Sequence, residues 1–292
     1  MSYKTVCVAG GGVLGSQIAF QAAYCGFDVT IWLRSEGSIG RTQPKIDRVR
    51  KEYIAAIEGM ADGTGEWCAG IADGTQPFDK EAALAAVERA YSTLKLELDL
   101  AKAVADADLV IESMAEDTQA KIDFYKKLAP VLPQKTVIVT NSSTLLPSTF
   151  AKYTGRPEKY LSLHFANSIW KNNMTEVMAQ DQTDKRYFDE HVDFANDIRM
   201  LALPVNKEKN GYLLNSMLVP WLLSGLDLYV SGVSDPKSID LAWTRGTGAP
   251  KGPVPRIRHG GYPDGLQHRH AVSEGAGLGE PAAQEDDDAL QL

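Results

Sequence analysis

The fold is decided by residues 6–23, VCVAGGGVLGSQIAFQAA, near the N-terminus of a chain of 292 residues. The apolar, β-branched start predicts a strand, the glycines predict a tight turn, and the apolar spacing after Gln17 predicts a helix. Gly26 ends this helix, and residues 28–33, DVTIWL, predict a second strand. Strand, helix and strand in this order form a right-handed unit with parallel strands. We therefore expect an α/β fold built on a parallel sheet.

The glycines in the turn follow the spacing GxGxxG at Gly10, Gly12 and Gly15. Gly10 allows the tight turn, Gly12 lets a phosphate approach the N–H groups at the helix N-terminus, and Gly15 lets helix and strand pack closely. Between a strand and a helix, this motif predicts a site for the pyrophosphate of a dinucleotide, with Val13 and Leu14 in the same turn. The alternative is a tight turn that binds no ligand.

The end of the second strand indicates which dinucleotide binds. An acidic residue there would accept hydrogen bonds from the ribose 2′-hydroxyl and favour NAD. The sequence instead has Leu33, Arg34 and Ser35, and the first acid is Glu36. Because Arg34 and Ser35 can both bind a 2′-phosphate, we expect NADP to be preferred. NAD remains possible, with Arg34 stacked on the adenine.

The rest of the pattern indicates two domains and a tail. Residues 44–98 have helical periodicity around a Gly/Asp-rich linker, which predicts a helical hairpin inserted into the sheet domain. Strand-like segments return at residues 109–112, 136–140 and 160–164, and helical patterns follow after Val205. We therefore expect a Rossmann-type, doubly wound parallel sheet in residues 1–205, a smaller all-α domain in residues 206–252, and an irregular tail in residues 253–292.

Composition and charge exclude several classes of function. A formal net charge of −8 disfavours a nucleic-acid-binding protein. The sequence has neither the pattern of a signal peptide nor an apolar stretch of membrane length, so we expect no membrane association. The three cysteines form no CxxC pair and no metal-ligand spacing with histidine. We therefore expect a cytoplasmic protein without a metal site.

One histidine lies where a parallel sheet gathers its ligands. His164 ends the strand expected at residues 160–164, and Glu176 follows twelve residues later. A carboxylate beside an imidazole fixes its tautomer and stabilises the imidazolium, so this pair would form a general base. A lone histidine at a strand end is more often structural, and the residues alone leave both interpretations open.

Several motifs together resemble one known family. They are the N-terminal glycines, Asn141-Ser142-Ser143-Thr144-Leu145, His164-Phe165-x-Asn167, Glu176 and Asn210-Gly211-Tyr212-Leu213-Leu214-Asn215. In order and spacing, from residue 5 to about 252, they resemble the L-3-hydroxyacyl-CoA dehydrogenase family, which includes the 3-hydroxybutyryl-CoA dehydrogenases. The resemblance implies an NAD(P)-dependent oxidoreductase of fatty acid metabolism. Such an enzyme exchanges a hydride between the nicotinamide and the 3-hydroxyl or 3-keto carbon of an acyl-CoA, and the family implies a homodimer.

Carried over residue by residue, the resemblance implies roles for particular side chains. His164 would be the base for the 3-hydroxyl, and Glu176 would orient it. Ser143 would hydrogen-bond the reacting oxygen, and Asn215 would contact the substrate and help to close the cleft. The remaining positions that match the cofactor site are Glu116, Lys121 and Asn141.

The sequence departs from the family after the histidine. Ala166 and Ser168 replace the family's phenylalanine and proline, which frees the loop and leaves acyl-chain length and CoA dependence open. One alternative is therefore an NADP-dependent dehydrogenase of a free hydroxy acid, held by Lys171 or Arg41. Another is a dinucleotide-binding protein with impaired catalysis. The basic run of the hairpin would bind CoA phosphates or form a solvated face; it comprises Arg41, Lys45, Arg48, Arg50 and Lys51.

The tail is expected to be translated out of frame. Up to residues 251–253, Lys-Gly-Pro, the sequence follows the family, whose next helix reads much like Thr-Ala-Tyr-Asn-Ile-Val. Codons permitted by the residues after Pro253, read from their second base, allow the family's residues in the same order. A chain without an apolar stripe would then replace helices that pack against a partner subunit. We therefore expect residues 253–292 to lack regular helices, and the homodimer is in doubt.

Overall fold

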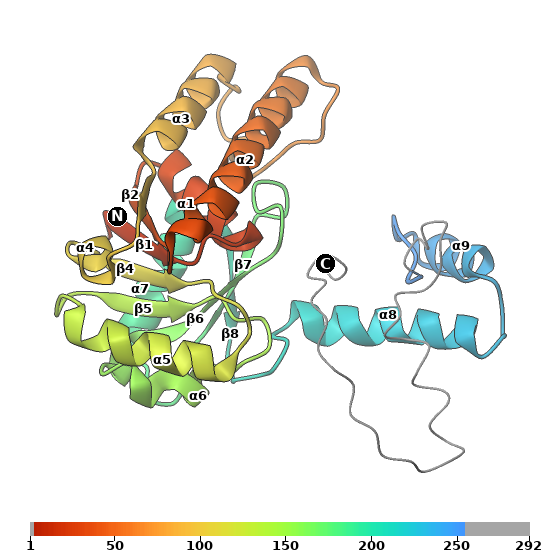
Figure 1. The fold of residues 1–292 in the computed structure, drawn as a ribbon. Helices are drawn as coiled ribbons and strands as arrows, with labels where there is room; N and C mark the ends of the chain where they lie inside the picture. The colour runs from red at the N-terminus through yellow and green to blue at the C-terminus, as the bar shows by residue number, and fades with distance from the viewer. Residues whose placement is uncertain (1–2, 255–292) are drawn as a thin grey trace, which may run out of the picture. The chain divides into compact units, whose positions relative to one another are not determined.

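The computed structural model describes residues 3–254, and these form two compact units with their boundary between Ser216 and Met217. In the first unit, eight strands form one sheet in the order β3-β2-β1-β4-β5-β6-β7-β8 (Figure 1). The strands are β1 (Thr5–Ala9), β2 (Asp28–Trp32), β3 (Lys95–Glu97), β4 (Leu109–Glu112), β5 (Val137–Thr140), β6 (Tyr160–Phe165), β7 (Met174–Met178) and β8 (Leu201–Val205). The expected Rossmann-type α/β fold is confirmed.

The direction of the last two strands differs from the expectation of a parallel sheet. Strands β1 to β6 are parallel, whereas β7 pairs with β6 in the antiparallel direction and β8 runs parallel to β7. Residues 166–173, which connect β6 to β7, are too few for the helical crossover that parallel strands need. The chain therefore turns back at the carboxyl edge of β6.

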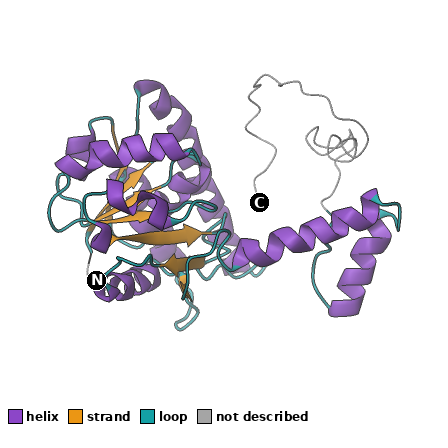
Figure 2. Ribbon diagram, turned by 90° about the horizontal axis from the view of Figure 1, so that it is seen from below, coloured by secondary structure: helices purple, strands orange, loops and turns teal. Residues whose placement is uncertain are grey.

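Helices cover both faces of this sheet (Figure 2). The core on one face includes residues of α1 (Val13–Tyr24), α2 (Glu36–Asp62), α3 (Lys80–Thr93) and α7 (Lys185–Asp197). The core on the other face includes residues of α4 (Leu100–Val104), α5 (Thr118–Leu128) and α6 (Pro147–Phe150). Three short 3-10 turns lie at Ala129–Val131, Ala151–Tyr153 and Pro157–Lys159. The central strands β1, β4, β5 and β6 are thus buried between two helical layers, which explains their nearly continuous apolar sequences, whereas the edge strands β3 and β8 are partly exposed.

The helical hairpin expected at residues 44–98 corresponds to α2 and α3, which lie side by side (Figure 1). Helix α2 already begins at Glu36 and continues through Pro44. Glu36 in the first turn complements the positive end of the helix dipole. The helix therefore starts directly after the end of β2.

The unit boundary lies after the expected domain boundary at residue 206, because Tyr212 packs on the sheet unit with Met178 and Val205. The second unit comprises most of α8 (Leu214–Val230) together with α9 (Pro236–Thr247). Within it, Trp221 and Trp243 contact each other with ring centroids 5.6 Å apart. No helix in the described part of the chain is long and apolar enough to cross a membrane.

Only the first two residues of the expected irregular tail are described. Pro253 and Val254 are buried, and the Val254 N–H donates to Asp240 Oδ1 at 2.9 Å. A Cβ on Gly225 would lie 2.6 Å from Pro253, so this glycine lets the proline pack directly on α8. The expectation for residues 255–292 lies outside the described residues.

Candidate active site

The glycine turn has the shape that a pyrophosphate requires. Gly10 has a φ of +120°, and a Cβ on Gly15 would lie only 2.2 Å from the Gly10 carbonyl oxygen. A Cβ on Gly12 would meet nothing within 4 Å, and no side chain caps the N-terminus of α1. Open space therefore lies in front of the N–H groups that begin α1, beside Val13 and Leu14. These residues fit a dinucleotide cofactor.

Sequence analysis missed the contact between Gly11 of this turn and Thr42 of α2. A Cβ on Gly11 would lie 2.1 Å from Oγ1 of Thr42, and this hydroxyl donates to the Gly11 carbonyl oxygen at 3.1 Å. Thr42 belongs to α2, so the hairpin helix supports the glycine turn from outside. The available signal was Gly11 itself, because the GxGxxG motif requires glycine at positions 10 and 12 but accepts any residue between them.

The end of β2 combines hydroxyl and guanidinium groups. Leu33 is buried, whereas Arg34 and Ser35 are exposed. Ser35 is the N-cap of α2, and its Oγ lies 3.0 Å from the Oγ of Ser38. Arg41, one turn further along α2, donates to Ser38 Oγ at 3.1 Å. The structure thus adds Ser38 and Arg41 to the residues expected at this strand end.

The histidine and glutamate singled out in the sequence face each other across β6 and β7. His164 is paired with Glu176 in the strand register, and its Nδ1 lies 2.8 Å from Glu176 Oε2. A carboxylate only accepts hydrogen bonds, so Nδ1 is the donor in this contact, and in the neutral imidazole the lone pair is on Nε2. His164 is 5% exposed and Glu176 is fully buried. Together they form a buried imidazole–carboxylate pair at the carboxyl edge of β6.

Glu176 also holds the beginning of α8. Its Oε1 accepts hydrogen bonds from the N–H groups of Leu213 and Leu214, each at 2.8 Å. Burial alone would raise the pKa of Glu176, but the hydrogen bonds from His164 and these two N–H groups outweigh it, so its pKa lies below the usual value. Glu176 is therefore an anion that can stabilise a proton on His164. Asn215 follows in the first turn of α8.

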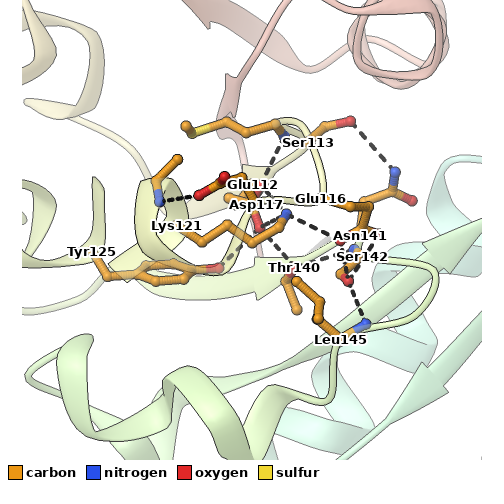
Figure 3. A network of polar contacts seen from close by, with 12 residues as sticks. Glu112, Ser113, Glu116, Asp117, Lys121, Tyr125, Thr140, Asn141, Ser142 and Leu145 are labelled. Carbon is orange, nitrogen blue, oxygen red and sulfur yellow. Dashed lines mark hydrogen bonds and ion pairs between the residues drawn. The ribbon is translucent and has the colours of Figure 1, made fainter. Parts of the chain in front are cut away.

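The serine expected to touch the reacting oxygen is held by Glu116. The Ser143 N–H donates to Glu116 Oε1 at 2.6 Å, and the Ser143 hydroxyl lies 3.2 Å from the same oxygen. Ser142 also donates to Glu116, at 2.7 Å (Figure 3). These serines belong to residues 141–146, the loop between β5 and α6, which we call the serine loop. Its buried Asn141 accepts a hydrogen bond from the Phe165 N–H at 3.0 Å, which ties the serine loop to β6.

Sequence analysis also missed Glu112, which holds Lys121 beneath the loop (Figure 3). The Lys121 ammonium lies 2.7 and 2.8 Å from the two Glu112 oxygens and 3.8 Å from Glu116, and both Lys121 and Glu112 are fully buried. Tyr125 and Thr140 donate their hydroxyls to Glu112 Oε2. Lys121 is therefore occupied by protein carboxylates. An acid ending an otherwise apolar strand was the available signal.

Most of the other basic candidates lie on α2, and two of them are paired. Arg50 donates to both carboxylate oxygens of Glu88, each at 2.8 Å, and Arg48 lies 3.3 Å from Glu52.

In the connection after His164, Trp170 is buried against Tyr53, with ring centroids 5.1 Å apart, whereas its neighbour Lys171 is exposed. No group of three potential metal ligands occurs within residues 3–254.

A doubly wound sheet with an open glycine turn and an imidazole–carboxylate pair at its carboxyl edge is typical of dinucleotide-dependent dehydrogenases. Comparison with known proteins narrows this class. The model of the 3-hydroxyacyl-CoA dehydrogenase NAD binding domain matches residues 5–209, and that of the C-terminal domain of the same family matches residues 211–282. The chain therefore belongs to the 3-hydroxyacyl-CoA dehydrogenase family and is an oxidoreductase of that type.

Individual relatives agree with this assignment. The chain is 27% identical to the 3-hydroxybutyryl-CoA dehydrogenase of Clostridioides difficile, over 85% of this chain and 80% of that protein. It is 28% identical to the mitochondrial hydroxyacyl-coenzyme A dehydrogenase of Homo sapiens, over 86% and 74%. It is also similar to the solved structure of a diketoreductase of dicarbonyl compounds, with 43% identity, a TM-score of 0.71 and coverage of 87% and 82%.

Proposed function

We propose that this chain exchanges a hydride between a nicotinamide dinucleotide and the 3-hydroxyl or 3-keto carbon of a 3-hydroxyacyl-CoA. The observation that carries the proposal is the buried His164–Glu176 pair, whose free Nε2 is available to a substrate. In the oxidation direction, Nε2 accepts the proton of the 3-hydroxyl, and anionic Glu176 stabilises the imidazolium through Nδ1–H. The bound nicotinamide supplies the hydride acceptor or donor.

Ser143 and Asn215 complete the proposed site. A rotation of its side chain would turn the Ser143 hydroxyl from Glu116 to the substrate oxygen, where it would donate a hydrogen bond. Asn215, in the turn whose N–H groups hold Glu176, would contact the substrate. The cofactor would be held by the glycine turn and, around the nicotinamide half, by Glu116 and Asn141. The expected direct contact from Lys121 is replaced by an indirect one, because its buried ammonium binds Glu112 and lies 3.8 Å from Glu116.

For the cofactor we propose NADP over NAD. Arg34 and Arg41 supply two positive charges near the end of β2, and Ser35 and Ser38 supply hydroxyl donors at the first turn of α2. A helix N-terminus flanked by guanidinium groups suits a 2′-phosphate. The acid in the first turn of α2, Glu36, comes after the strand-end position at which an acid would favour NAD. The matching family model describes an NAD binding domain, so the preference for NADP is a property proposed for this chain.

A second candidate substrate is a free dicarbonyl compound or hydroxy acid. The 43% identity with a diketoreductase favours it, as does the pairing of Arg48 and Arg50 with acids, which leaves fewer cations for CoA phosphates. Lys171 is exposed just after the His164 loop and could hold a carboxylate. Both candidates use the same His164 chemistry.

The test is a spectrophotometric assay of acetoacetyl-CoA and free acetoacetate, each with NADPH and NADH. We expect the highest kcat/KM with acetoacetyl-CoA and NADPH. Replacement His164→Gln should lower kcat by about 10²–10⁴-fold, because it removes the general base, with the cofactor Kd unchanged. Near-normal turnover by this variant would remove His164 from the mechanism, and turnover of acetoacetate alone would select the second candidate.

We also propose a cytoplasmic location, because Cys7, Cys25 and Cys68 are all unpaired thiols.

A further inference from the structure

A tyrosine outside the proposed proton-transfer pair lies directly on its imidazole. The ring of Tyr212 stacks on that of His164, with centroids 4.6 Å apart and an interplanar angle of 19°. Tyr212 is 1% exposed, so its ring shields one face of the imidazole from water. Because Glu176 holds the Nδ1 edge and Tyr212 covers a face, the imidazole has little freedom to rotate about χ2.

The same short segment contacts the other parts of the site. The Tyr212 hydroxyl donates to the Ser142 carbonyl oxygen at 2.8 Å, next to Ser143. The N–H groups of the two following residues, Leu213 and Leu214, bind Glu176. Residues 212–214 therefore contact the imidazole, its carboxylate and the serine loop at once.

The backbone at Tyr212 lies in a conformation that its side chain does not favour. Its φ is +50°, in the left-handed region where bulky residues are rare, and it follows Gly211 with a φ of +79°. Such a conformation persists only where surrounding contacts determine it, and it is concentrated at functional sites. Here the contacts are the ring stack on His164 and the hydroxyl bond to Ser142.

We infer that Tyr212 is a positioning residue for His164, which its ring holds in the orientation that receives the substrate proton. The inference rests on the proposed role of His164 as the base. The face of an aromatic ring is electronegative, so the Tyr212 ring also favours the imidazolium over the neutral imidazole when the proton arrives. The hydroxyl of Tyr212 contributes by holding the ring in a fixed position relative to the serine loop, through its hydrogen bond to the Ser142 carbonyl oxygen.

The first experiment compares Tyr212→Leu and Tyr212→Phe with a matched control, Tyr3→Leu. Tyr3 is also buried, also donates its hydroxyl, to Glu190, and also contacts a buried histidine, with its ring 5.4 Å from that of His191. We expect Tyr212→Leu to lower kcat by about 10²-fold with KM changed by less than about threefold, because the base is misplaced. Tyr212→Phe should retain kcat within about fivefold, and Tyr3→Leu should retain it fully. A wild-type kcat in Tyr212→Leu overturns the inference.

The second experiment does not depend on turnover. ¹⁵N NMR of His164 without substrate should show one Nδ1–H tautomer in the wild type and Tyr212→Phe, and a mixture or broadened signals in Tyr212→Leu. An unchanged imidazole spectrum in Tyr212→Leu contradicts the inference. If the spectra change but the wild type turns over no substrate, the proposed function fails and the positioning role stands.

A third variant covers the case in which Tyr212→Leu does not fold. Pentafluorophenylalanine at position 212 keeps the aromatic shape but reverses the charge on the ring face. We expect its kcat to fall about tenfold below that of Tyr212→Phe if the ring stabilises the imidazolium. Equal kcat values for these two proteins would remove the electrostatic part of the role. If the pentafluorophenylalanine protein also shows the wild-type imidazole spectrum, the ring acts by its shape alone.

Discussion

Single residues decide which nitrogen of His164 faces the substrate in the proposed site and which charge lies beside the adenosine ribose of the proposed cofactor. Glu176 accepts from Nδ1, and this one contact places the lone pair on Nε2. At the other end of the proposed cofactor site, Arg34 occupies the position where an acid would favour NAD. Each feature depends on one side chain, so each is open to a point mutation.

We expect Arg34→Asp to reverse the cofactor preference from NADPH to NADH. The substitution removes a cation from a 2′-phosphate and adds an acceptor for a 2′-hydroxyl. The kcat/KM values for both cofactors measure the change. Arg48→Asp is the control, because Arg48 is an exposed arginine of the adjacent helix α2 that pairs with Glu52. A wild type that prefers NADH, or an Arg34→Asp variant with unchanged preference, would contradict the proposed phosphate site.

His191 should make the protein less stable in mild acid. Burial lowers its pKa to about 4, against which its hydrogen bond to the Tyr187 carbonyl has a smaller effect. Between pH 6.5 and 4 the unfolded chain binds a proton that the folded chain does not, so the free energy of unfolding falls as pH falls. We expect this group to remove about 2 kcal/mol between pH 7 and pH 5. Urea unfolding at the two pH values measures it, and His191→Leu should lose that part of the pH dependence.

At the scale of elements, the short connection between β6 and β7 creates the proposed base. An antiparallel return pairs His164 with Glu176, whereas a helical crossover would have placed β7 in the parallel direction with another register. Helix α5 contributes in a different way, because it sends Lys121 back to Glu112 at the end of β4. The loop with Glu116 lies between these elements.

We expect Lys121→Met to destabilise the first unit by about 3–5 kcal/mol, because it leaves the Glu112 carboxylate buried without a counter-charge. Urea unfolding followed by circular dichroism measures the loss. The double variant Lys121→Met/Glu112→Gln should recover much of it. Lys127→Met, an exposed lysine of the same helix, should change stability by less than about 0.5 kcal/mol. A Lys121→Met protein as stable as that control would show that the pair is not needed.

At the scale of the whole molecule, the described part of the second unit carries many exposed apolar side chains. Helix α8 buries only Gly225 among its residues, and Met217, Leu223 and Val233 are 66%, 54% and 67% exposed. Apolar side chains of α8, such as Met217 and Leu223, are therefore exposed in the part of the chain that the structure describes. The interpretation of residues 253–292 as out-of-frame translation stays a prediction.

We expect this chain to be monomeric, whereas a chain with the reading frame restored after Pro253 should form the homodimer that the family implies. The restored helices would cover the apolar face of α8 and bind a partner. Light scattering coupled to gel filtration measures both masses, and the gene sequence shows whether a frame change exists. A stable dimer of the present chain would contradict the prediction, as would a gene with an intact frame.

The sequence by itself determined the α/β class, the glycine turn and the position of His164 at a strand end. These features depend on local spacing, in which a strand, a turn and a helix each leave a pattern within about 20 residues. Glu176 was a candidate partner for His164 from the residues alone, and its role in orienting the imidazole was implied by the resemblance, because no local pattern links the two residues.

The tertiary structure decided the contacts between distant segments: Thr42 on Gly11, Lys121 on Glu112, the start of α8 on Glu176, and Tyr212 on His164. Strand register and side-chain packing select these partners, and both depend on the whole sheet unit. In the sequence, Tyr212 is therefore recognised only as part of a motif that precedes a helix, and nothing there predicts its contact with His164. Its place on the imidazole follows from the turn at Gly211 and from the return of the chain to the carboxyl edge of the sheet.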